Sequence, residues 1–195
     1  LKNDNYFLIV IDNLRYDQWL TIKPIIEELF IIDKEEIYTS IVPSTTQYAR
    51  NSLLAGMMPY DIKQNFSSKW IDEETKEGKN LHEEYFLNEN LKRNHISTKL
   101  SYNKITKLSS GKKLVSNFNN LLQNQLNTII YNFVDTLSHS RTDMEVIKEL
   151  AENEASYRSI TLSWFKHSPL FEIIKKINWT NGFFRKDIGF KVIDQ

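Results

Sequence analysis

The sequence of 195 residues contains no cysteine. Disulfides and thiolate chemistry are therefore excluded, and any metal ion would have to be held by oxygen and imidazole ligands. An excess of charge of one sign is also missing, because Lys plus Arg and Asp plus Glu both number 25, which gives a formal net charge of zero. A chain without a basic field has no electrostatic signature of binding to long nucleic acids.

Long hydrophobic runs are missing as well. The longest, such as Phe7 to Ile11, are far shorter than a membrane helix requires, and the start of the chain lacks the basic and apolar segments of a signal peptide. We therefore expect no membrane contact and a cytoplasmic location. The 41% of hydrophobic and 12% of aromatic residues are enough to bury one sizeable core.

Strand and helix patterns alternate along the chain. The continuous apolar run from Tyr6 to Ile11 ends at Asp12 and is typical of a strand covered on both faces, and a β-branched run from Thr128 to Val134 ends at Asp135. A further strand is expected over 96–102, an irregular segment over 61–80, and helices over 17–30, 45–55, 81–91, 113–125, from 142 and over 169–177. This order predicts an α/β fold with a mostly parallel sheet flanked by helices.

Four polar residues follow these elements at places where α/β proteins bind ligands. They are Asp12, Thr46, Asp135 and His139. Aspartates after strands and a threonine at a helix start can meet at the carboxyl edge of a parallel sheet, although each residue alone is more often a simple cap or a solvated side chain. A threonine hydroxyl becomes a competent nucleophile when helix amides and a divalent metal favour its charged form. Thr45 is the competing candidate, one position earlier.

Arg50 lies one helical turn beyond Thr46. Its guanidinium could bind a phosphate group with two hydrogen bonds, or it could form an ordinary salt bridge. The sequence leaves both readings open.

Three blocks of the chain carry a family resemblance. They read VIDNLRYDQW from Val10, PSTTQYARNSLLAGMMP from Pro43, and NFVDTLSHSRTDMEVIKELAENEASYRS from Asn132. In this order and spacing they resemble the PglZ family of the alkaline phosphatase superfamily, over residues 6–177. They are most similar to the PglZ domain of PorX-like response regulators, which are linked to type IX secretion.

The resemblance implies an alkaline-phosphatase-like fold with two zinc ions and a hydrolase of the phosphodiesterase type. On the family pattern Thr46 is the nucleophile and Asp12 shares its metal, while Asp135 and His139 hold the companion metal. The implied substrate is a phosphoester or a small nucleotide. A role as the output domain of a two-component regulator, with signalling proteins as partners, is implied too.

The chain departs from this pattern after His139. The family completes its site with an Asp-His pair after the next strand and a later histidine, but the only histidine beyond His139 is His167. We therefore expect residues 1–177 to form a partial domain that lacks about half of the metal ligands, and residues 178–195 to be an unmatched tail. The alternative function is a non-catalytic interaction or regulatory module, or a truncated remnant.

Overall fold

The computed structural model describes residues 5–37, 41–42, 45–71, 78, 80–132, 134, 136–137, 145–181 and 188–193, the last segment by its backbone. The chain divides into two compact units. The first comprises Leu1–Ile37 and Lys99–Asp194, and the second comprises Tyr38–Thr98. Each unit is described by itself.

The first unit is built on a sheet of four strands in the order β2-β3-β1-β4. The strands are β1 (Tyr6–Asp12), β2 (Leu100–Ile105), β3 (Leu126–Tyr131) and β4 (Ile188–Ile193). Every pairing is parallel, and Ile9 of β1 lies opposite Ile129 of β3 on one side and Phe190 of β4 on the other. The predicted α/β class with a parallel sheet is confirmed.

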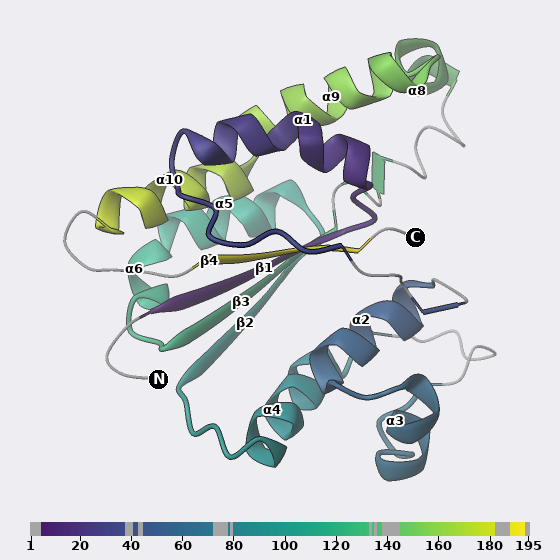
Figure 1. The fold of residues 1–195 in the computed structure, drawn as a ribbon, viewed down its shortest axis with the longest axis vertical. Helices are drawn as coiled ribbons and strands as arrows, with labels where there is room; N and C mark the ends of the chain where they lie inside the picture. Colours follow the sequence, from purple (N-terminus) through teal and green to yellow (C-terminus); the bar gives the residue numbers. More distant parts are fainter. Residues whose placement is uncertain are drawn as a thin grey trace. The chain divides into compact units, whose positions relative to one another are not determined.

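Helices of the first unit cover the sheet. They are α1 (Tyr16–Glu27), α5 (Leu108–Ser116), α6 (Phe118–Leu121), α8 (Glu145–Leu150), α9 (Glu154–His167) and α10 (Pro169–Asn181). Helices α1, α5, α9 and α10 lie on the same side of the sheet (Figure 1). Ile9 of β1, Ile22 of α1 and Ile173 of α10 share one buried core there. Ile9 and Val10 point to opposite faces and are both fully buried, as the continuous apolar run predicts.

Several expected boundaries were wrong. Strand β2 begins at Leu100 rather than at residue 96, and β3 spans Leu126–Tyr131 rather than residues 128–134. Asp135 lies outside the described residues. The helix expected from residue 142 is divided into α8 and α9, because Asn153 begins a new helix by accepting a hydrogen bond from the Ser156 amide at 2.9 Å. Residues 178–195, expected to be a tail without a family match, contain the end of α10 and the edge strand β4.

The second unit contains helices α2 (Thr46–Ala55), α3 (Pro59–Asn65) and α4 (Glu83–Arg93). Gly56 ends α2 with a φ of 60°, a left-handed conformation that favours glycine, as expected from the sequence. Helix α3 was not predicted, because most of its residues are polar and a single buried residue, Ile62, anchors it. Ile62 is fully buried against Ala55 and Phe86.

Gly111, inside α5, packs against the ring of Pro169 at the start of α10. A methyl group at Gly111 would lie 2.8 Å from Cβ and 2.9 Å from Cγ of Pro169. Gly→Ala usually stabilises a helix by about 1 kcal/mol, but a rigid ring cannot move aside. We expect Gly111→Ala to destabilise the protein by about 1–2 kcal/mol in urea unfolding. Ser109→Ala, at an exposed position of the same helix, is the control and should not destabilise it.

Candidate functional site

Asp12 lies at the carboxyl end of β1, between β3 and β4, and its side chain is fully buried. The next residue, Asn13, has a φ of 58° and turns the chain out of the strand, and Leu14 is fully buried immediately after it. Asparagine is among the few residues that tolerate this left-handed conformation. The strand end and the turn together hold the Asp12 carboxylate at a defined place on the edge of the sheet.

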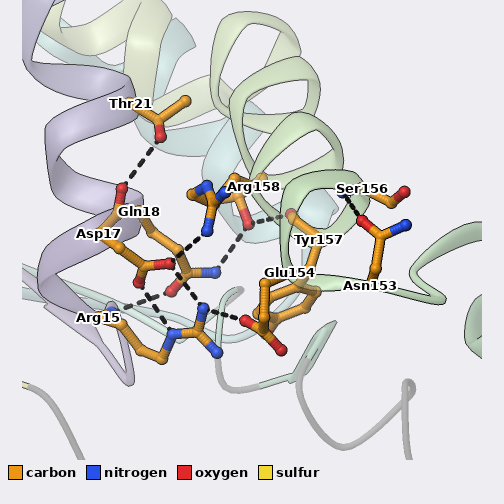
Figure 2. A network of polar contacts seen from close by, with 10 residues as sticks. Arg15, Asp17, Gln18, Thr21, Asn153, Glu154, Ser156, Tyr157 and Arg158 are labelled. Atoms are coloured by element: carbon orange, nitrogen blue, oxygen red, sulfur yellow. Dashed lines mark hydrogen bonds and ion pairs between the residues drawn. The ribbon is translucent and has the colours of Figure 1, made fainter.

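A network of charged side chains joins the start of α1 to the start of α9 (Figure 2). Arg15 donates from Nε to Asp17 Oδ1 at 3.0 Å and from Nη2 to Oδ2 at 2.8 Å, and it also pairs with Glu154, the first residue of α9. Arg158 donates to the same Asp17 Oδ2 at 3.1 Å. The guanidinium of Arg15 lies over the ring of Tyr157, 5.4 Å from its centre. These contacts fix the first turns of the two helices side by side.

A buried polar chain continues this link into the protein. The Arg15 amide donates to Gln18 Oε1 at 2.9 Å, and Gln18 Nε2 donates to the Thr161 hydroxyl at 2.8 Å. Thr161 in turn donates to the carbonyl of Tyr157 at 2.9 Å. Gln18 and Thr161 are both fully buried, so each hydrogen bond avoids the cost of an unsatisfied polar group. The start of α1, which follows the turn after Asp12, is therefore held by a hydrogen bond within α1 and by a hydrogen bond to α9.

The charged network predicts a dependence of stability on pH. The hydrogen bond from Arg15, helped by Arg158 and opposed by partial burial, lowers the pKa of Asp17 from 3.8 to about 2. A lowered folded-state pKa contributes stability above the unfolded value, and this contribution is lost as the pH falls from about 4 through 2. Because Asp17 is 39% exposed, solvent screening limits the effect.

We therefore expect Asp17→Asn to lower the free energy of unfolding by about 1 kcal/mol or less at pH 7. The difference from the parent chain should shrink between pH 4 and pH 2, measured by urea unfolding at each pH. High salt should reduce it too, because the pairs are near the surface. A difference that does not change with pH would mean that Asp17 acts only through packing.

Thr46 is the first residue of α2, and Thr45 is the N-cap residue with extended backbone. The Thr45 carbonyl accepts from the amides of Tyr48 at 3.0 Å and Ala49 at 2.9 Å. Thr45 is exposed, whereas Thr46 is half-buried. The sequence-based expectation that Thr46 lies in the first turn is confirmed, and its hydroxyl belongs to the end of the helix that favours negative charge.

Arg50 forms the salt bridge that the sequence left open as an alternative. Its Nε donates to Glu83 Oε1 at 2.6 Å and its Nη2 donates to Oε2 at 2.9 Å. Both side chains are only 1% exposed. Glu83 could not be identified as the partner from the sequence, because it begins α4 in a polar stretch 33 residues along the chain from Arg50. A role of Arg50 in substrate binding stays a prediction.

Of the four candidate residues, the structure describes Asp12 and Thr46. Asp12 belongs to the first unit and Thr46 to the second, while Asp135 and His139 lie outside the described residues. Among the residues that the structure describes, no group of three or more His, Asp or Glu side chains could hold a metal ion. The convergence of the four residues therefore stays a prediction. The two described members offer a buried carboxylate and a hydroxyl, oxygen donors that suit a divalent cation.

The parallel sheet, with a buried aspartate at the end of an inner strand, places the chain in the class of α/β proteins, in which ligands generally bind beyond the carboxyl ends of the strands. Comparison with protein families is more specific. Residues 1–182 match the family described as the BREX system PglZ alkaline phosphatase-like domain, and the chain belongs to that family. A comparison with curated proteins gave no match.

Membership confirms the PglZ resemblance and the alkaline-phosphatase-like fold. It indicates a phosphoesterase-type module that acts on phosphoester substrates and belongs to a group that usually binds metal ions. The closeness to PorX-like regulators stays a prediction. In the part of the chain that the structure describes, no helix is long and apolar enough to cross a membrane. The cytoplasmic location likewise stays a prediction.

Proposed function

We propose that this chain is the nucleophile-bearing part of a zinc-dependent phosphodiesterase in which Thr46 attacks the phosphorus atom. The observation that carries the proposal is the position of Thr46 as the first residue of α2, in a chain of the PglZ family. Helix amides at this end favour the negative charge that develops on the attacking oxygen and on the phosphoryl group. Short or cyclic nucleotides are the proposed substrates.

Metal ligands in this proposal come from strand ends. Asp12 would share one zinc ion with Thr46, and Asp135 and His139 would hold the companion ion. Bound zinc would supply positive charge that lowers the pKa of the Thr46 hydroxyl and offsets charge on the phosphoryl oxygens. The burial of Asp12 supports this role, because a carboxylate held out of water binds a cation more strongly than a solvated one.

The test is hydrolysis of bis-p-nitrophenyl phosphate by the purified chain with added zinc, combined with measurement of bound metal. We expect turnover that a chelator abolishes and that zinc restores. Asp12→Asn, which keeps the size of the side chain, should lower both metal content and turnover. An active Asp12→Asn variant with full metal content would contradict the assignment, and an inactive parent chain with zinc bound would rule out catalysis.

A non-catalytic regulatory module is the second candidate, and the place of His167 favours it. This histidine is exposed at the end of α9, where its Nδ1 contacts the carbonyl of Ser163 at 2.7 Å, a helix-terminal contact rather than a metal-ligand position. Without further metal-ligating residues after His139, the module would act by binding signalling proteins, such as partners in type IX secretion. Zinc-independent folding without turnover would favour this candidate over catalysis.

A further inference from the structure

The salt bridge between Arg50 and Glu83 is unusual because it is fully buried in the second unit. Helices α2 and α4 lie side by side (Figure 1), and the pair joins the middle of α2 to the first residue of α4. Removing two charges from water costs about as much as their attraction returns, so a buried pair is weak evidence of a purely stabilising role. In some proteins such a pair instead specifies one geometry, and here the elements that it joins include α2, which begins at Thr46.

Asn80 connects the pair to Thr46. Its Nδ2 donates to Glu83 Oε1 at 3.1 Å and to the backbone carbonyl of Thr46 at 3.1 Å. Glu83 Oε1 therefore accepts from both Arg50 and Asn80. Because Arg50 follows Thr46 by one helical turn, the four residues form a closed circuit within one unit.

We propose that Asn80 is a positioning residue for Thr46, and that the Arg50–Glu83 pair orients Asn80. This inference rests on the proposed function for its kinetic consequence. The side-chain amide of Asn80 could rotate freely without a fixed partner. Its Nδ2 donates to the buried carboxylate of Glu83, and this hydrogen bond restricts the rotation. The other contact then holds the first residue of α2, whose hydroxyl must meet the phosphorus atom within a narrow range of distance and angle.

The positioning role predicts a change in kcat without a change in binding. Asn80→Ala in the full 195-residue chain should lower kcat for bis-p-nitrophenyl phosphate by about 10–100-fold, because a misplacement of about 1 Å has this effect. KM and bound zinc should stay unchanged. Asn88→Ala is the matched control, because Asn88 also donates from Nδ2 to a backbone carbonyl, that of Glu84 at 2.9 Å on α4. It should leave kcat unchanged.

A second measurement reports on Thr46 without requiring activity. The methyl resonance of isotope-labelled Thr46 should shift in Asn80→Ala and in Glu83→Gln, and it should not shift in Asn88→Ala. Asn80→Ser, with a side chain too short for both contacts, replaces the alanine variant if that variant folds poorly.

The outcomes separate the two proposals. A methyl shift in a chain that shows no turnover would support the positioning of Thr46 and contradict the phosphodiesterase function. An unchanged methyl resonance, or an unchanged kcat in an active chain, would overturn the positioning role. A fall in zinc content or a rise in KM that matches the fall in kcat would also overturn it, because Asn80 would then act on binding.

Discussion

Thr46→Ala is expected to lower zinc-dependent hydrolysis of bis-p-nitrophenyl phosphate by about 10³-fold or more, because it removes the attacking oxygen. The fold should be little affected, since Thr46 is half-buried at the first position of α2 and alanine is a good helix residue. The measurement is kcat/KM with zinc in excess, together with the thermal midpoint. Thr46→Ser, which keeps a hydroxyl, should retain part of the activity.

Thr45→Ala is the matched control for this prediction. Thr45 is the preceding residue, carries the same side chain, is exposed and is the N-cap residue of α2. Its replacement should lower helix stability by about 1 kcal/mol at most and leave kcat within a few-fold. If Thr45→Ala abolishes turnover and Thr46→Ala does not, the nucleophile is one position earlier. If neither variant loses activity, hydrolysis does not use a threonine of this helix.

Elements with a local signal were predictable from the sequence. Strand β1 follows from the uninterrupted apolar residues up to Asp12, and the end of α2 follows from Gly56. The positions of Asp12 at a strand end and of Thr46 at a helix start follow from the same rules, because caps and periodicity involve only neighbouring residues. This part of the candidate site could be placed without coordinates.

The contacts that hold these residues could not be predicted, because they join distant segments. Glu154 reaches Arg15 over 139 residues, and Arg158 reaches Asp17 over 141. Neither acidic nor basic residues on a helix surface reveal their partners from local spacing, since every turn of a solvated helix carries such residues. Strand β4 was not predicted either, although its β-branched and aromatic residues favour a strand.

The buried pair in the second unit provides the largest expected effect on stability. Arg50→Met would leave the Glu83 carboxylate buried without its guanidinium partner. Glu83→Leu would likewise leave the Arg50 guanidinium buried without its carboxylate partner. Each single variant should lose about 3–5 kcal/mol of unfolding free energy. For a chain of this size that corresponds to a fall in the thermal midpoint of about 6–20 °C, measured by circular dichroism.

The double variant Arg50→Met/Glu83→Leu tests what the pair is for. Apolar side chains of similar volume pack without desolvating a charge, so the double variant should recover most of the stability lost by either single variant. Asn80 would then lack the carboxylate that orients it, and kcat should remain low although the fold is restored. Recovery of both stability and kcat would show that the pair serves packing alone. A double variant no more stable than the single variants would show that the charged groups themselves hold α2 against α4.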